Sequence, residues 1–223
     1  MKVLLASQVH LLFSTYALSN ESEEVAAMML GSVLDGCLSI SDVVFCSRKD
    51  KRKDRVEISN EQLMLAMEKA DSLGLRVLGW MHSHPKITVL PSHVDLKTQL
   101  SFQALDANFV GIIYSCFHEN QNKSFRTQTT AFQSILDEDQ SIKQVYIPLQ
   151  IVPSKNGVID SSKFLGLLDI PAIYMEEESE IIQGSRDILT TSLSSARILK
   201  IQTALVMPLM EILKHRLQCC RSQ

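Results

Sequence analysis

Two histidines at the end of a short apolar run constrain this chain more than any other feature of its sequence. Residues 75–80 are mostly apolar and typical of a strand, which leads directly into His82 and His84. Because side chains on a strand alternate between its two faces, both imidazoles point to the same side. Ser92 then predicts the N-cap of a helix over residues 93–106. We expect the end of the strand and the start of this helix to lie together.

Asp95 completes the pattern, because it lies one turn into that helix and its carboxylate can face the strand end. Two imidazole nitrogens and one carboxylate oxygen form a three-ligand zinc set that leaves the fourth tetrahedral position open for water. Zinc lowers the pKa of such a water from about 16 to about 7, which provides hydroxide at cellular pH. A lone H-x-H pair on a strand is more often an ordinary surface pair, but the full spacing H-x-H-x7-S-x2-D favours a catalytic metal site.

Composition excludes several other classes. The 22 Lys and Arg against 25 Asp and Glu give a net charge of −3, without the basic excess of a nucleic-acid-binding protein. No uninterrupted apolar run approaches the roughly 18–20 residues of a membrane span, and the N-terminus has no features of a secretory signal. With 223 residues, of which 45% are apolar, the chain can form a core without disulfides.

The cysteines argue against two further chemistries. There are five, with no C-x-x-C pair, so neither a disulfide framework nor a four-cysteine zinc site is expected. Cys46 and Cys116 lie in apolar, strand-like runs, which favours small buried side chains over a catalytic thiolate. Unpaired cysteines of this kind agree with an intracellular setting, and we expect a cytoplasmic and nuclear protein.

The N-terminal third predicts a helix followed by a hairpin. The helix is expected over residues 9–18, with Ser7 as its N-cap. Residues 24–34 suit a buried strand, although their Ala and Met content also allows a helix. The pair Asp35-Gly36 predicts a turn into a partner strand over residues 37–47.

A helix, further strands and a helical tail are expected after this hairpin. Pro148 favours an edge position for the last strand, and Pro208 predicts a kink or break in the tail, which begins at Ser161. The run of eight charged residues Arg48–Arg55 is typical of a solvated loop. The helix expected after the hairpin spans residues 60–73, and the further strands span residues 109–117, 124–135 and 145–152.

The run from His82 to Asp95 matches without a gap the signature of the JAMM (MPN+) metalloproteases, and the chain resembles this family over residues 9–153. The resemblance implies an α/β (α+β) MPN fold, a curved mixed sheet flanked by helices, as a domain over residues 1–155. A C-terminal helical extension over residues 156–223 follows. The resemblance also implies one Zn2+ per chain, held by His82, His84 and Asp95.

The family further requires a glutamate as general base, for which Glu21, Glu23 and Glu24 are candidates. Glu24 is preferred because it directly begins the strand, as the family glutamate does. Glu23 is the alternative, although its side chain would point to the opposite sheet face. By the same resemblance, the Ser92 hydroxyl stabilises the oxyanion of the tetrahedral intermediate. A helix N-cap is the structural alternative for Ser92, and the two roles can coexist.

Within the family, residues 79–99 and the later segments 109–117, 132–135 and 147–153 resemble the lysine-63-specific branch found in the BRISC and BRCA-A complexes. This implies a deubiquitinase that cleaves isopeptide bonds in lysine-63-linked polyubiquitin, with a role in DNA repair. It also implies a catalytically inactive MPN− pseudo-deubiquitinase partner, bound through the C-terminal helices within a larger complex. An apolar stripe at helical spacing suits that contact, and it comprises Ile198, Ile201, Leu205, Ile212 and Leu213.

Two alternatives remain open at this point. The chain could be a non-catalytic MPN scaffold, although such subunits lose the histidines or the aspartate. It could also be an isopeptidase for another ubiquitin-like modifier. Some relatives hold a second, structural zinc, but Cys116 and His118 are too few ligands for one. The loop Arg48–Arg55 could contact ubiquitin, although a solvated loop is favoured.

Overall fold

The computed structural model describes residues 1–48, 58–119, 125–153 and 161–221. The chain divides into two compact units, Met1–Lys163 and Phe164–Gln223. Most of the charged run predicted as a loop, residues 49–55, lies outside the described residues. No helix in the part of the chain that the structure describes has both the length and the apolar character needed to cross a membrane.

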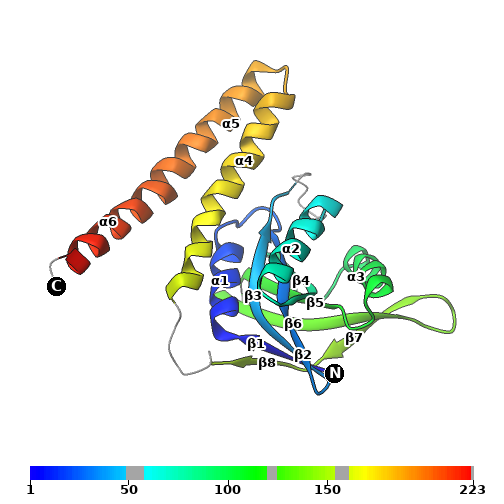
Figure 1. Cartoon of the computed structure of the whole chain (residues 1–223). Helices are drawn as coiled ribbons and strands as arrows, with labels where there is room; N and C mark the ends of the chain where they lie inside the picture. Colours follow the sequence, from blue (N-terminus) through cyan, green and yellow to red (C-terminus); the bar gives the residue numbers. More distant parts are fainter. Residues whose placement is uncertain (49–57, 120–124, 154–160, 222–223) are drawn as a thin grey trace. The chain divides into compact units, whose positions relative to one another are not determined.

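A mixed sheet forms the centre of the first unit (Figure 1). Among the described residues it has eight strands in the order β7-β6-β5-β4-β2-β3-β1-β8. Strand β4 is parallel to β5, and β1 is parallel to both β3 and β8, whereas the other neighbouring pairs are antiparallel. The strands are β1 Lys2–Ala6, β2 Ala26–Leu34, β3 Cys37–Cys46, β4 Arg76–Pro85, β5 Val110–Glu119, β6 Phe125–Leu136, β7 Ile142–Ile147 and β8 Leu149–Val152.

The predicted hairpin is confirmed, and it lies beside the strand that carries the histidines. Asp35 and Gly36 both have positive φ, 49° and 73°, as a tight hairpin turn requires. Strand β2 is a strand and not a helix, and its first residue, Ala26, pairs with His82 of β4. The residues just before β2 therefore lie next to the end of β4.

The prediction of one strand over residues 145–152 is wrong. The chain forms β7 and β8 instead, with Pro148 between them, and these two strands lie at opposite edges of the sheet. Pro148 has no N–H for a ladder, while its carbonyl oxygen accepts a hydrogen bond from Val3 N of β1 at 2.8 Å. One residue thus separates the two edge strands, which requires the sheet to curl.

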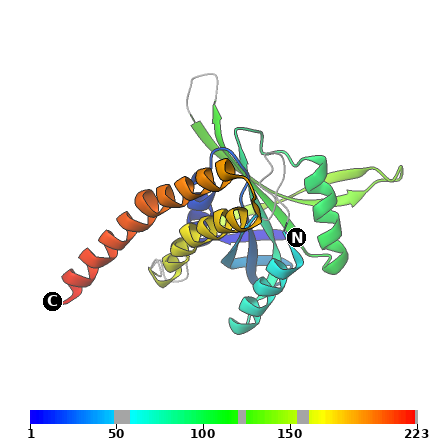
Figure 2. The same ribbon diagram turned by 90° about the horizontal axis from the view of Figure 1, so that it is seen from above.

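Helices cover both faces of the sheet, as the view from above shows (Figure 2). Helix α1 (Ser7–Leu18) contacts β1, β3 and β5, whereas α2 (Asn60–Ser72) contacts β2 and β4, and α3 (His93–Leu105) contacts β5, β6 and β7. Adjacent β5 residues point to opposite faces. Ile113 joins the buried cluster that includes Ala66 of α2, and Tyr114 contacts Phe13 of α1 with ring centroids 4.9 Å apart.

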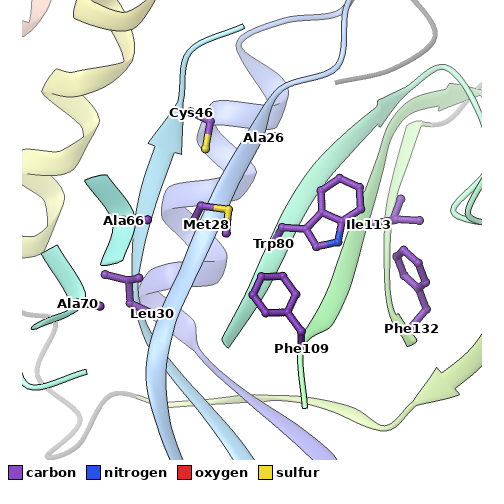
Figure 3. Close-up of a cluster of buried hydrophobic side chains, with 10 residues drawn as sticks. All are labelled: Ala26, Met28, Leu30, Cys46, Ala66, Ala70, Trp80, Phe109, Ile113 and Phe132. Carbon is purple, nitrogen blue, oxygen red and sulfur yellow. The ribbon is translucent and has the colours of Figure 1, made fainter. Parts of the chain in front are cut away.

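The core on the α2 face surrounds Trp80, the residue two positions before the first histidine (Figure 3). Trp80 is 1% exposed and lies among apolar side chains from β2, β5, β6 and α2. The cluster comprises Ala26, Met28, Leu30, Cys46, Ala66, Ala70, Trp80, Phe109, Ile113 and Phe132. Burial of these apolar side chains stabilises the position of β4 against α2 and the neighbouring strands.

The start of the chain differs from the sequence-based prediction. Residues 2–6 form β1, which the prediction did not include, and this strand leads directly into α1. Ser7 is therefore the first residue of the helix and not its cap. The N-cap position belongs to Ala6, which makes no side-chain capping bond. The strand hydrogen bonds of β1 fix the entry to the helix in place of a cap.

The second unit is helical among its described residues, as predicted for the tail. A 3-10 segment (Ser161–Leu168) precedes α4 (Asp169–Gly184), which lies alongside α5 (Ile188–Ile201) (Figure 1). A π-helical turn, η2 (Gln202–Val206), then joins α5 to α6 (Met207–Arg221). Helix α6 continues through Pro208, so no break occurs at that residue; the irregularity in this region is the π-helical turn directly before the proline, which has no N–H to donate.

Candidate metal centre

The end of β4 and the start of α3 bring three potential metal ligands together. His82 Nε2 and His84 Nε2 lie 3.1 Å apart. Asp95 Oδ1 lies 3.3 Å from the first of these nitrogens, and Oδ2 lies 3.4 Å from the second. The three side chains are nearly inaccessible to solvent, at 0%, 1% and 4% exposed. The predicted convergence of strand and helix is therefore present in the structure.

The donor set fits a small divalent cation. A tetrahedral zinc site with bonds of about 2.0–2.1 Å has ligand–ligand edges of about 3.3–3.4 Å. The observed separations of 3.1, 3.3 and 3.4 Å lie close to that range. Two imidazoles and one carboxylate are also the ligand types that zinc accepts. His82, His84 and Asp95 could thus hold one metal ion between them.

A backbone carbonyl orients one of the two imidazoles. His84 Nδ1 lies 2.7 Å from the Thr88 carbonyl oxygen. Since a carbonyl can only accept, Nδ1 donates, and Nε2 of the neutral ring keeps a lone pair that a metal ion beside Asp95 and His82 could accept. Histidines that bind metals commonly donate their other nitrogen in this way, which fixes the tautomer and the ring orientation.

The pKa values of the ligands reflect this mutual contact. Burial lowers the pKa of His84, but hydrogen bonds to Asp95 and Thr88 and the charges of Glu24 and Asp95 outweigh it, so the pKa is raised. Burial raises the pKa of Asp95, yet the charge of His82 and hydrogen bonds from His82, His84 and Ser92 hold it well below its usual range. Asp95 is therefore a carboxylate at neutral pH, which is the form in which it could bind a metal ion.

Asp95 is also part of the helix cap. Ser92 Oγ accepts a hydrogen bond from Asp95 N at 3.1 Å, and Asp95 Oδ2 accepts one from Ser92 N at 2.6 Å. This reciprocal pair is a capping box, which satisfies two N–H groups at the helix start. The cap aims the Asp95 side chain at the strand end, and Ser92 remains exposed beside the ligands. The N-cap prediction for Ser92 is thus confirmed.

Glu24 faces the ligands from the other side of the site. Its Oε1 lies 3.9 Å from His84 Nε2, and the side chain is 3% exposed. Glu24 comes just before β2, whose pairing with β4 places it there. Backbone bonds of Val25 reinforce the position, because Ser83 N donates to Val25 O at 2.9 Å and Val25 N donates to Ser83 Oγ at 3.0 Å.

The other two glutamates considered from the sequence have different neighbours. Glu23 Oε2 lies 2.5 Å from Arg48 Nη1, and Arg48 is 5% exposed. Glu21 pairs with Lys86 at 2.7 Å on the surface. The structure thus brings Glu24 to the ligands and directs Glu23 and Glu21 to basic side chains elsewhere.

Two contacts of the site were not foreseen. The Ser83 hydroxyl accepts a hydrogen bond from Val25 N, next to Glu24, and so links the histidine strand to the glutamate. The Thr88 carbonyl had no sequence signal at all, since any residue supplies it. On a strand, a serine between two ligand positions faces the side opposite to the ligands. This alternation could have predicted that Ser83 points away from the histidine side chains.

Comparison with known proteins identifies the family of this chain. Residues 1–108 match the family described as JAB1/Mov34/MPN/PAD-1 ubiquitin protease. A lysine-63-specific deubiquitinase BRCC36 from Xenopus tropicalis is 38% identical over 222 residues, covering 92% of this chain and 84% of that protein. This chain belongs to the JAB1/Mov34/MPN/PAD-1 ubiquitin protease family.

Further relatives carry the same description. The BRCC36 protein of Camponotus floridanus is 39% identical, with 83% of this chain and 74% of that protein covered. The human BRCC36 protein is 34% identical, with coverage of 80% and 74%. A solution structure of the protein DSY2949 from Desulfitobacterium hafniense has the same fold, with a TM-score of 0.50 at 14% identity, over 70% of this chain and 99% of that one.

The described cysteines agree with a metal-based member of this family. Burial raises the pKa of the Cys46 thiol to about 12 and that of the Cys116 thiol to about 11. Both groups are thus neutral at cellular pH, as expected for the small buried side chains predicted from the sequence.

Proposed function

We propose that this chain is a zinc-dependent deubiquitinase that hydrolyses the isopeptide bonds of lysine-63-linked polyubiquitin. The observation that carries the proposal is the convergence of His82, His84 and Asp95, with Glu24 beside them, in a chain of this family. The lysine-63 linkage rests on the relatives, which are named lysine-63-specific deubiquitinases.

The proposed roles follow from the chemistry of each side chain. His82, His84 and Asp95 would hold Zn2+, which supplies a Lewis acid that polarises an oxygen of the substrate or of water. Glu24 accepts the proton of the attacking water and returns it to the leaving lysine amine. Its position, 3.9 Å from His84 and almost fully buried, excludes bulk water from that proton transfer.

Ser92 has the geometry to serve the reaction and the helix together. Its oxygen accepts from Asp95 N, which leaves the hydroxyl hydrogen free to donate. Because Ser92 is exposed next to Asp95, a substrate carbonyl oxygen can receive that hydrogen. The hydroxyl would then stabilise the developing oxyanion.

The variant Ser92→Ala is expected to lose stability and rate together. Loss of the N-cap costs about 1 kcal/mol of unfolding free energy. Loss of the oxyanion donor lowers kcat about 10²-fold, at the low end of the usual range because the position is exposed. Urea unfolding and diubiquitin cleavage measure the two effects. Ser59→Ala is the matched control, since Ser59 forms the same capping box on α2; it should lose stability and keep kcat. Equal kcat values for both variants would contradict the oxyanion role.

We also propose that the helical unit binds an MPN− partner. Several large apolar side chains of this unit are exposed, which supports a contact surface. Of the stripe predicted from the sequence, Ile212 is exposed and Ile198, Ile201 and Leu205 are half-buried. The strongly exposed apolar residues among the described part of the unit are Leu165, Ile188, Leu189, Leu193, Leu199, Met207, Met210 and Ile212.

A linkage panel tests the proposed function. The full chain, alone and co-expressed with an MPN− subunit, is assayed on ubiquitin dimers of each defined linkage and on a neddylated substrate. We expect cleavage of lysine-63-linked dimers at least about tenfold faster than any other substrate, with the higher rate in the complex. Faster release of the other modifier would favour an isopeptidase of different specificity. Absence of cleavage in both preparations, when zinc is bound, would favour a scaffold.

A further inference from the structure

Three polar residues, two of them buried and one half-buried, form a line along the α3 face that contacts the sheet. Asp95, Gln99 and Gln103 are spaced by four residues, so they lie one above the other on the helix. Each bonds to a different part of the sheet. Asp95 lies against the histidines of β4, and Gln103 accepts from Ser134 N at 2.8 Å and donates to Ser134 O at 3.0 Å. Gln99 lies between them.

Gln99 is fully buried and all its side-chain polar atoms have partners. Its Oε1 accepts from Trp80 Nε1 at 2.9 Å. Its Nε2 donates to Phe109 O at 2.7 Å and to Gln103 Oε1 at 2.9 Å. With an exposure of 0%, this amide would be costly to bury unless the bonds formed. Those bonds form at a single position of α3 relative to the sheet.

The sheet leaves room for this amide by means of a glycine. Gly111 of β5 pairs with Trp80 of β4. A Cβ at Gly111 would lie 3.2 Å from Gln99 Oε1 and 2.5 Å from the Phe132 ring. The Gln99 amide therefore occupies the space that a side chain at position 111 would fill. There it accepts the hydrogen bond from the indole N–H and so fixes the direction of that group.

The indole in turn supports a metal ligand. The Trp80 ring stacks on the His82 imidazole, with centroids 4.4 Å apart and planes inclined by 12°. His82 Nδ1 is buried and has no hydrogen-bond partner among the described residues, unlike His84, whose Nδ1 is held by a carbonyl. The stack with Trp80 thus constrains the plane of the His82 ring, together with the contacts that its Nε2 makes with His84 and Asp95.

We propose that Gln99 is a positioning residue of the metal centre, which holds the Trp80 indole flat against His82 and keeps α3, with Asp95, at one register on the sheet. An apolar side chain could fill the same volume without partners, but it would tolerate sliding and rotation of the helix. The inference rests on the proposed metal role of His82. Its first readout, however, needs no metal.

The single tryptophan of the chain makes the contact directly observable. The Trp80 indole N–H gives one cross-peak in the 15N–1H spectrum of the full chain. In the metal-free wild type, we expect slow exchange of this proton with solvent. In Gln99→Met, which keeps the volume and removes the amide, we expect exchange at least about tenfold faster. Unchanged exchange would overturn the proposal whether or not the chain binds zinc.

Zinc affinity, measured by competition with a chromophoric chelator, gives the second readout. We expect Gln99→Met to bind zinc about 10–100-fold more weakly, the usual cost of losing an outer-shell contact. Wild-type chain that binds no zinc would refute the metal site itself, whereas equal affinity of wild type and Gln99→Met would overturn only the positioning role.

Two further variants separate positioning from general destabilisation. Gln103→Met removes the acceptor of one Gln99 Nε2 hydrogen bond but leaves the bonds of Gln99 to Trp80 Nε1 and Phe109 O; it should lower the melting temperature and change zinc affinity and indole exchange less than about threefold. Trp80→Phe removes the indole N–H, and Gln99→Met added to it should weaken zinc binding by a smaller factor than in the wild-type background, since the contribution of Gln99 through the indole is already lost. Additive losses would overturn the proposal. If Gln99→Met does not fold, Trp80→Phe alone must still lower zinc affinity for the proposal to stand.

Discussion

Replacement of Glu24 with glutamine should yield a folded, zinc-loaded chain that cleaves lysine-63-linked diubiquitin about 10³–10⁴-fold more slowly than the wild type. Glutamine has the shape of glutamate but cannot accept a proton at neutral pH. The loss of rate is expected at the upper end of the range for removal of a general base, about 10²–10⁴-fold, because Glu24 both accepts and returns the proton. Since Oε1 lies 3.9 Å from His84 Nε2 and the side chain is 3% exposed, bulk water cannot easily replace it.

The neighbouring glutamates provide matched controls for this prediction. Glu21→Gln removes one exposed ion pair with Lys86 and should leave stability and rate close to wild type. Glu23→Gln should keep kcat but lower the unfolding free energy by about 1–3 kcal/mol, because it weakens the pairing of buried Arg48. Zinc content is measured for every variant. A large loss of kcat in Glu23→Gln and not in Glu24→Gln would show that Glu23, and not Glu24, is the general base.

The sequence predicted the centre of the fold well because its local signals agree with the tertiary structure. The hairpin between β2 and β3 was predicted from Asp35-Gly36, a pair suited to the positive φ angles it adopts. Helix α3 was predicted from Ser92, which does form the cap. The three candidate ligands were predicted because their spacing is periodic on a strand and on the first turn of a helix, so geometry within each element was enough.

The remaining features depend on pairing between distant segments. Strand β1 has only five residues, and its parallel partners β3 and β8 follow far along the chain, so no local turn announces it. The split at Pro148 was missed because residues 145–152 alternate as one strand would, while the two halves pair with β6 and β1. Gln99 was missed because hydrophobic periodicity marks apolar faces, and the sheet-facing line of α3 is polar.

The choice between the candidate bases shows the same limit. Adjacent residues in an extended segment point to opposite sides, so the sequence could state that Glu23 and Glu24 differ in direction but not which faces the metal ligands. The register of β2 on β4, with Ala26 opposite His82, decides the matter. Such a register is set by the whole sheet, and one residue of slip would exchange the two side chains.

Asp95→Asn is expected to abolish zinc binding in the accessible concentration range and, with it, all measurable cleavage. The loss of affinity should exceed the roughly 10–100-fold cost of an outer-shell change, because a charged ligand is removed. The fold should survive, since the asparagine carbonyl can still accept the hydrogen bond that Asp95 Oδ2 accepts from Ser92 N at 2.6 Å. A loss of at most about 1 kcal/mol in unfolding free energy is expected.

Comparison with Ser92→Ala separates the two functions of this helix start. That variant removes the cap and should keep zinc affinity within about threefold of wild type, whereas Asp95→Asn keeps the cap and loses the metal. Chelator competition and urea unfolding on both variants measure the contrast. Zinc binding by Asp95→Asn at wild-type affinity would show that another carboxylate completes the ligand set. Glu24, whose Oε1 lies 3.9 Å from His84 Nε2, is the nearest candidate. The double variant Asp95→Asn, Glu24→Gln would then lose the metal, and Glu24 would have to be reassigned from base to ligand.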